Sequence, residues 1–139
     1  MALVFGSWPY AKDLAQIDLP LLRLKETKQR LAVIVDEMGK SAMTSVERVS
    51  SHGLMQLLRL SPKTGRMHQL RVHCAATGMP IVGDDIYGDF KKNKSVDRQF
   101  RRRLFLHAKA IEFYHPVAKK RILVESELPE VFSDITRDK

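Results

Sequence analysis

Arg71 is the residue whose surroundings pose the clearest chemical question. Apolar residues at helical spacing predict a helix over about residues 67–77, and these residues are Met67, Leu70 and Cys74. Arg71 falls on the flank of this stripe, so its guanidinium is expected to be partly buried and to need a negatively charged partner. Its helical neighbours offer no carboxylate. Two interpretations stay open: Arg71 reaches solvent or pairs with a structural acid such as Asp84, or it holds a functional carboxylate or a phosphate.

Two groups of cations indicate contact with a polyanion. Lys63 and Arg66 lie in a turn directly before the predicted helix, where an RNA phosphate could rest near the helix N-terminus. The segment 91–103 carries seven cations and one anion, and Phe100 is its single aromatic residue. Cations that repel one another are better accommodated against phosphates, so this segment predicts RNA or DNA contact. The alternatives are a solvated turn and a solvated, flexible basic face.

Several other chemistries are poorly supported. The turn around Lys63 lacks the Gly-x-x-x-x-Gly-Lys-Ser/Thr pattern of phosphate-binding loops. His68 and His73 are five residues apart, on different sides of the predicted helix, and zinc spacings are absent, so we expect no metal. A motif for Ser-His-Asp or Cys-His nucleophilic catalysis is also missing, and Cys74 is better explained as a small core residue.

The elements that position these residues are mostly strands. A strand is expected at residues 2–8, an irregular excursion at 9–30 and a short strand at 31–35. Residues 41–49 and 54–60 form a hairpin around a four-residue loop, 50–53. After the helix comes a turn-rich loop at 83–89. The later elements are a long central strand over 104–114, a strand over 122–126 and a helix over 129–136. The predicted fold class is α+β with a largely antiparallel mixed sheet and few helices.

Length and composition limit the number of domains and the kinds of partner that this chain could have. The 139 residues suit one domain, and no apolar run reaches the roughly 20 residues of a membrane-spanning helix. Lys and Arg number 24 and Asp and Glu 16, which gives a net charge of +8 and favours a polyanionic partner. The single cysteine suits a reducing cytoplasm, and residues 1–10 do not resemble a signal peptide.

Three spaced blocks resemble a known family. They are the segments 65–73 (GRMHQLRVH), 78–88 (GMPIVGDDIYG) and 103–108 (RLFLHA). In this order they resemble the C-terminal part of the catalytic domain of RluA-type pseudouridine synthases, most closely the branch that acts on large-subunit ribosomal RNA. The resemblance continues upstream through residues 18–23 and 39–44, so it covers nearly the whole chain.

The resemblance implies both an activity and residue roles. This family isomerises uridine to pseudouridine within RNA without cofactor or metal, after extruding the base from its stack. Arg71 matches the family arginine that ion-pairs with the catalytic Asp, and Leu106 matches the apolar residue beside the uracil. The cations predicted to face RNA, together with one histidine, are Lys63, Arg66, His68, Arg98, Arg101, Arg102 and Arg103.

The family's catalytic Asp, in a His-Arg-Leu-Asp motif, has no match in this sequence, and the family's strand Tyr would fall just before Met1. We therefore expect an N-terminally truncated synthase domain that is inactive alone. A non-catalytic RNA-binding module is the main alternative, and a generic basic domain without an RNA role is a third. Oligomeric state stays open.

Overall fold

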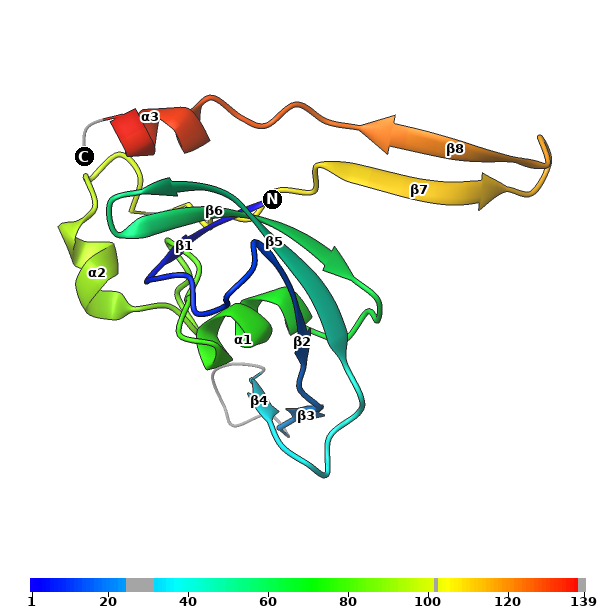
Figure 1. Cartoon of the computed structure of the whole chain (residues 1–139), viewed down its shortest axis with the longest axis horizontal. Coiled ribbons are helices and arrows are strands. Elements are labelled where there is room, and N and C mark those ends of the chain that lie inside the picture. The colour runs from blue at the N-terminus through cyan, green and yellow to red at the C-terminus, as the bar shows by residue number, and fades with distance from the viewer. Residues whose placement is uncertain (25–31, 102, 138–139) are drawn as a thin grey trace.

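The largest element is a four-stranded antiparallel sheet with the strand order β1-β6-β5-β2. The computed structural model describes residues 1–24, 32–101 and 103–137. The strands are β1 (Ala2–Phe5), β2 (Leu14–Asp18), β5 (Met43–His52) and β6 (Met55–Pro62). All four residues of β1 are buried although β1 is the last strand in this order, because the chain around Ile81 and Leu106 bridges to its other edge. Figure 1 shows the long strands β5 and β6 curving across the molecule.

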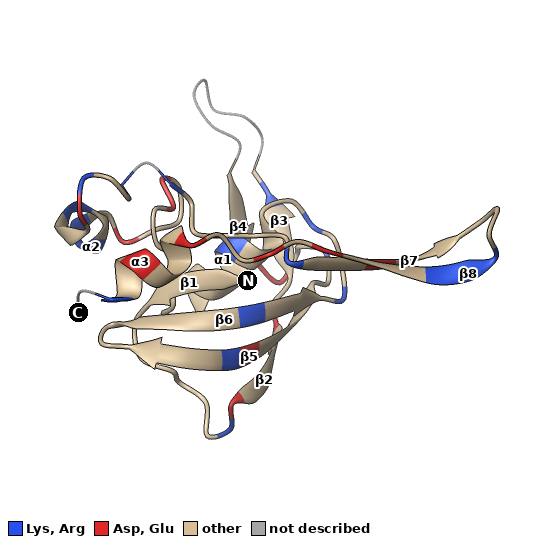
Figure 2. Ribbon diagram, turned by 90° about the horizontal axis from the view of Figure 1, so that it is seen from above, with Lys and Arg blue, Asp and Glu red and all other residues tan. Residues whose placement is uncertain are grey.

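Two separate hairpins complete the strand content. β3 (Leu21–Arg23) pairs with β4 (Val33–Val35), and β7 (Ala110–His115) pairs with β8 (Lys120–Glu125). The β7–β8 hairpin projects away from the body (Figures 1 and 2). The described strand pairs are all antiparallel, which confirms the predicted fold class.

Three short helices lie on or beside the sheet. They are α1 (Gln69–Ala76), α2 (Phe90–Ser95) and α3 (Val131–Arg137). The buried residues of α1 are Gln69, Val72, His73 and Cys74, and Cys74 packs in the main core with β1 and β6. Val72 joins a second, smaller core beneath the β3–β4 hairpin, with Leu21, Val33 and Ala42. Helix α1 thus connects the sheet with the hairpin. Among the described residues, no helix is long and apolar enough to span a membrane.

The first half of the chain differs from the sequence prediction in two places. Residues 9–30 are not an irregular excursion throughout, because β2 and β3 lie within them; residues 25–31 are outside the described part. The prolines and mixed charges of residues 9–30 led the sequence prediction to miss β2. In this strand Ile17 is buried and Leu14 is exposed, as in an edge strand. The β5–β6 turn is also tighter than predicted, since pairing continues to His52 and Met55 and leaves two residues in the turn. Gly53, with φ +56°, permits it.

The second half differs in its strands and helix starts. The predicted central strand over 104–114 is wrong. Only Ala110–His115 forms a strand, and Ile111 and Tyr114 on it are exposed, because hydrophobic residues here belong to a projecting hairpin rather than to a covered sheet. The segment before it runs beside β1, where Ala2 bridges Leu106. Helix α2 was not predicted, and α3 begins at Val131, two residues after Pro129.

Candidate functional site

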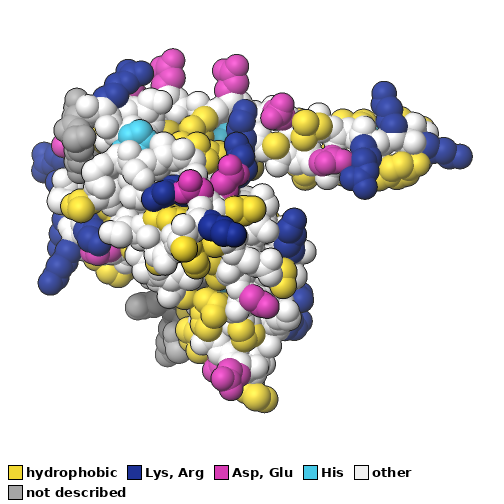
Figure 3. Space-filling view, in the orientation of Figure 1, with side chains coloured by type: hydrophobic (Ala, Val, Ile, Leu, Met, Phe, Trp, Pro, Cys, Tyr) yellow, Lys and Arg dark blue, Asp and Glu magenta, His cyan; other side chains and the backbone are white. Residues whose placement is uncertain are grey.

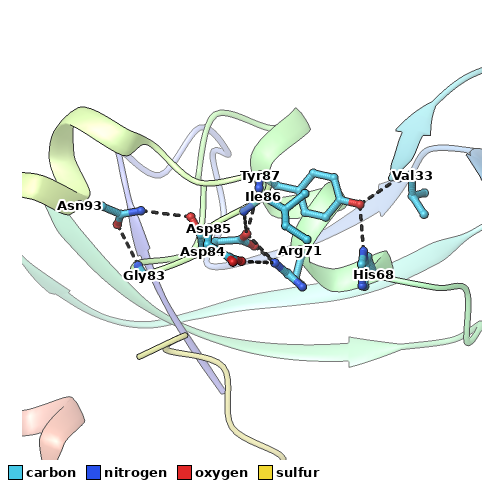
Figure 4. Close-up of polar contacts among 9 residues, drawn as sticks. All are labelled: Val33, His68, Arg71, Gly83, Asp84, Asp85, Ile86, Tyr87 and Asn93. Carbon is cyan, nitrogen blue, oxygen red and sulfur yellow. Dashed lines mark hydrogen bonds and ion pairs between the residues drawn. The ribbon is translucent and has the colours of Figure 1, made fainter. Parts of the chain in front are cut away.

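Arg71 forms a bidentate ion pair with Asp84. Its Nε donates to Asp84 Oδ2 at 2.8 Å, and its Nη2 donates to Asp84 Oδ1 at 2.7 Å (Figure 4). Asp85 Oδ1 lies 3.3 Å from the same Nη2. The side chain of Asp84 is fully buried and that of Arg71 is 15% exposed. Of the partners considered for Arg71 from the sequence, the structure therefore shows the structural acid Asp84, so this guanidinium does not lack an acid within the chain.

The loop that carries Asp84 folds tightly around the carboxylate. Oδ1 accepts hydrogen bonds from the backbone N–H groups of Ile86 and Tyr87, both at 2.9 Å. At Gly83, with φ +74°, a Cβ would lie 1.8 Å from the carbonyl oxygen of Arg103, so only glycine fits. Asn93 fastens the loop from outside, since it donates to the Asp84 carbonyl and accepts from Gly83 N–H. The predicted turn-rich loop is confirmed, and it presents the buried Asp84 carboxylate to Arg71.

The electrostatics of the pair keep both partners charged. Burial acts to raise the pKa of Asp84, but the hydrogen bonds from Arg71, Tyr87 and Ile86 outweigh it, so the pKa lies below the usual Asp value. The hydrogen bond to Asp84 raises the pKa of Arg71 against the opposing effect of burial. The Arg71 guanidinium also lies over the ring of Tyr87, with Cζ 5.3 Å from the ring centroid. Asp84 thus binds one edge of the Arg71 guanidinium, and the ring of Tyr87 contacts its planar face.

The turn before α1 is fastened by Gln69. Its Oε1 accepts from Thr64 Oγ1 at 2.7 Å and from Arg66 N–H at 3.0 Å. Its Nε2 donates to the Met43 carbonyl and to Thr44 Oγ1, both at 3.0 Å. His68, which directly precedes the helix, has φ 53° and ψ 17° in the left-handed region. This conformation is why α1 begins at Gln69 rather than at Met67 as predicted.

A cavity of about 360 Å³ brings the candidate residues together. Its lining includes Arg66, His68, Arg71 and Leu106. A volume of this size falls within the roughly 300–1,000 Å³ typical of small-molecule sites. Pro62, Leu70 and Leu106 give it apolar walls, and Arg66, His68 and Arg71 supply hydrogen-bond donors. Arg71 and Leu106, 35 positions apart in sequence, share this space because the segment after residue 103 returns beside β1.

The predicted RNA-facing residues form two groups. Lys63 and Arg66 are exposed in the turn after β6, close to the cavity. The second group, Arg98, Arg101 and Arg103, is exposed in the segment after α2, and Arg102 lies outside the described residues. The two segments lie at opposite ends of β5 and β6 (Figures 1 and 2), and Figure 3 shows Lys and Arg side chains gathered near α2. The two groups thus lie on separate segments of the chain.

Two residues weighed for other chemistry belong to the core. Cys74 is fully buried, and burial raises its pKa to about 12, so it is a core residue as expected rather than a nucleophile. His73 is also fully buried, and its ring nitrogens contact Thr44 Oγ1 and the Leu19 carbonyl, each at 3.0 Å. Among the described residues, no cluster of three His, Cys, Asp or Glu side chains could hold a metal ion.

Sequence reasoning missed Gln69 and Tyr87 as site residues. Both lie inside blocks that carried the family resemblance, so the signal was present, but neither has a charge or an obvious chemical role. The contacts of Gln69 reach residues 25 and 26 positions away on β5, and those of Tyr87 reach Val33 and His68. Such long-range contacts are not visible from local spacing.

Comparison with known proteins shows what the chain is similar to. The family model described as RNA pseudouridylate synthase matches residues 9–76. Over 139 aligned residues, 99% of this chain, the sequence is 37% identical to a "Ribosomal large subunit pseudouridine synthase C" from Buchnera aphidicola subsp. Baizongia pistaciae. The chain matches a fragment of a pseudouridine synthase catalytic domain. The Escherichia coli K12 pseudouridine synthase of the same name is 36% identical over 94% of this chain.

The fold of the chain matches solved pseudouridylate synthase domains. The human RNA Pseudouridylate Synthase Domain Containing 1 aligns with a TM-score of 0.73 and 26% identity, covering 91% of this chain and 52% of the human one. The human Domain Containing 4 protein aligns with a TM-score of 0.67 at 21% identity, which supports the fold alone. The chain spans 44% and 41% of the length of the Buchnera and Escherichia coli relatives.

Proposed function

We propose that this chain provides the base pocket and part of the RNA-binding surface of a pseudouridine synthase that acts on large-subunit ribosomal RNA. The observation that carries the proposal is the shared cavity: Arg71 and Leu106, assigned from family motifs that lie far apart in sequence, line the same space. The relatives from Buchnera and Escherichia coli carry ribosomal large subunit pseudouridine synthase names, which supports this RNA class.

The bonding of Arg71 leaves room for a second acid. A guanidinium has five N–H groups, and the pairs with Asp84 and Asp85 involve only Nε and Nη2. In the described part of the chain, Nη1 has no hydrogen-bond partner. A catalytic carboxylate could therefore bind at Nη1 while Asp84 holds the opposite edge. Asp84 then fixes the orientation of the guanidinium, and Arg71 orients the incoming carboxylate by charge-assisted hydrogen bonds.

The chemistry implied by the family suits this cavity. The target uridine is extruded from its stack, its C1′–N1 bond breaks, the uracil turns, and a C1′–C5 bond forms. The C5 proton leaves to solvent and N1 gains a proton, so atoms balance without a cofactor. The apolar wall at Leu106 would contact the face of the uracil, and the donors around it would bind the uracil carbonyl oxygens. The carboxylate nucleophile is not supplied by a His-Arg-Leu-Asp motif in this sequence.

RNA backbone contact is proposed at both basic patches. Lys63 and Arg66 would bind phosphates next to the extruded nucleotide, while Arg98, Arg101, Arg102 and Arg103 would contact the strand farther away. The net charge of +8 also favours association with RNA irrespective of its sequence. We also propose a cytoplasmic location, because a single cysteine provides no internal disulfide framework.

A tritium-release assay tests the proposal. Ribosomal RNA labelled at C5 of uridine releases tritium when C5 becomes bonded to C1′. We expect no release by this chain alone and clear release by a version extended at its N-terminus with the corresponding catalytic segment of a relative. Turnover by this chain alone would contradict the assignment of the nucleophile. A folded, extended version without turnover would contradict the synthase function.

The second candidate is an RNA-binding module without catalysis. It is favoured by the net charge of +8 on this chain. This alternative predicts salt-dependent RNA binding by the chain and no turnover by the extended version. A chain that fails to bind RNA at moderate salt would exclude both candidates.

A further inference from the structure

Tyr87 connects three parts of the site. Its ring lies against the Arg71 guanidinium, its backbone N–H binds Asp84, and its hydroxyl lies 2.9 Å from both Val33 N and His68 Nδ1 (Figure 4). The ring also packs beside the second core, beneath the β3–β4 hairpin. The hydroxyl therefore joins the hairpin to the residue that directly precedes α1.

The hydrogen-bond partners of the Tyr87 hydroxyl favour one position for the proton on His68. The backbone N–H of Val33 can only donate, so the Tyr87 oxygen accepts that bond. The phenol oxygen has a second lone pair, so this contact could run in either direction. His68 Nδ1 is, however, the acceptor that the described residues offer to the hydroxyl hydrogen, and this pairing leaves the proton on Nε2. Burial, with a smaller effect of the nearby Arg71 charge, lowers the pKa of His68, in agreement with a neutral ring.

The remaining nitrogen of His68 is available to a ligand. His68 lines the cavity with Arg71 and Leu106, and the described residues give its Nε2 no hydrogen-bond partner. Its left-handed backbone, with φ 53° and ψ 17°, is an uncommon conformation for a non-glycine residue. The T-shaped packing of the His68 and Tyr87 rings, with centroids 5.6 Å apart, restricts ring rotation.

We propose that Tyr87 is a positioning residue that holds His68 in its Nε2–H form, so that this N–H donates to a carbonyl oxygen of the extruded base. The inference rests on the proposed function for the base, but the tautomer itself is a property of this chain. Tyr87 acts on the substrate only through His68 and Arg71. Its hydroxyl fixes the tautomer of His68, and its ring packs against the Arg71 guanidinium.

Tyr87→Phe separates these two roles because it removes the hydroxyl and keeps the ring. The matched control is Tyr114→Phe, which removes an exposed hydroxyl on the projecting hairpin. Nitrogen NMR of the ¹⁵N-labelled chain reports the His68 tautomer directly. We expect a single Nε2–H form in the wild type and in Tyr114→Phe, and a mixture of both neutral tautomers in Tyr87→Phe. An unchanged Nε2–H form in Tyr87→Phe would overturn the role of the hydroxyl.

The functional half is tested in the N-terminally extended version. Tyr87→Phe should lower kcat/KM by about threefold to tenfold, the effect of one net hydrogen bond. In a His68→Phe background the same change should have no further effect, whereas His68→Gln, which restores an N–H donor, should recover part of the activity. An equal loss in the His68→Phe background would overturn the route through His68. Absence of turnover in the wild type would refute the proposed function and the base contact with it, while the tautomer result would still decide what Tyr87 does.

Discussion

Replacing Arg71 by Met should destabilise this chain strongly, because it leaves a buried carboxylate without its main partner. The Asp84 side chain is fully buried, and Arg71 supplies two of its four hydrogen bonds, at 2.7 and 2.8 Å. Breaking a buried ion pair by removing one partner costs roughly 3–5 kcal/mol. The N–H groups of Ile86 and Tyr87 remain, so we expect a loss of about 3 kcal/mol, at the lower end of that range.

Urea unfolding at pH 7 measures this loss, and the pH dependence identifies its cause. In the wild type, the lowered pKa of Asp84 adds stability above the usual carboxyl pKa, and this contribution is lost as the pH falls through the lowered value. In Arg71→Met, burial without the cation raises the pKa of Asp84. The gap between variant and wild type should therefore narrow as the pH falls from 7 towards about 4.

A second substitution provides the control. Adding Asp84→Leu to Arg71→Met removes the unpaired charge and should restore part of the stability, although Leu cannot replace the hydrogen bonds to the loop. A loss below about 1 kcal/mol for Arg71→Met, unchanged between pH 7 and 4.5, would refute the reasoning that this pair is a buried, mutually dependent unit.

Three further predictions follow from other parts of the structure. Changing residues 101–103 to Ala should weaken RNA binding and lower the slope of log K against log salt by about two. The same change at residues 119–121, at the start of β8 on the projecting hairpin, removes equal charge and should leave the slope near that of the wild type; equal effects would indicate that charge alone decides the binding. Gly83→Ala should lower Tm by several degrees or prevent folding, because its Cβ would overlap the Arg103 carbonyl; an unchanged Tm in a thermal melt would show that the loop can move. Burial lowers the pKa of His73, so stability should fall as the pH drops below about 6.5, where the unfolded histidine takes up a proton that the folded one resists; an NMR titration with an unshifted His73 pKa would contradict this.

The family blocks made the site partly predictable from sequence. Arg71 required a non-local partner because its helix offered no acid, and Asp84 was one candidate. Whether Arg71 pairs with Asp84 or with an acid outside this sequence depends on whether the loop over residues 83–89 folds back onto α1. That path depends on Gly83, Asn93 and the Arg103 backbone, which lie up to 20 positions apart.

The failures have definite physical causes. The start of α1 was placed too early because His68 adopts a left-handed conformation that apolar spacing cannot reveal. The segment 104–114 reads as a central strand because hydrophobic residues occupy both faces, yet Ile111, Phe113 and Tyr114 are exposed on a projecting hairpin. Periodicity reports which side chains are apolar, but burial is decided by what the rest of the fold covers.

Arg71→Ala in the N-terminally extended version tests the assignment of the base pocket most directly. If Arg71 orients the catalytic carboxylate, tritium release from ribosomal RNA labelled at C5 of uridine should disappear, while the affinity for that RNA, measured in parallel, stays within about threefold of the wild type because the two basic patches are untouched. A folded Arg71→Ala protein with near-normal turnover would contradict the account.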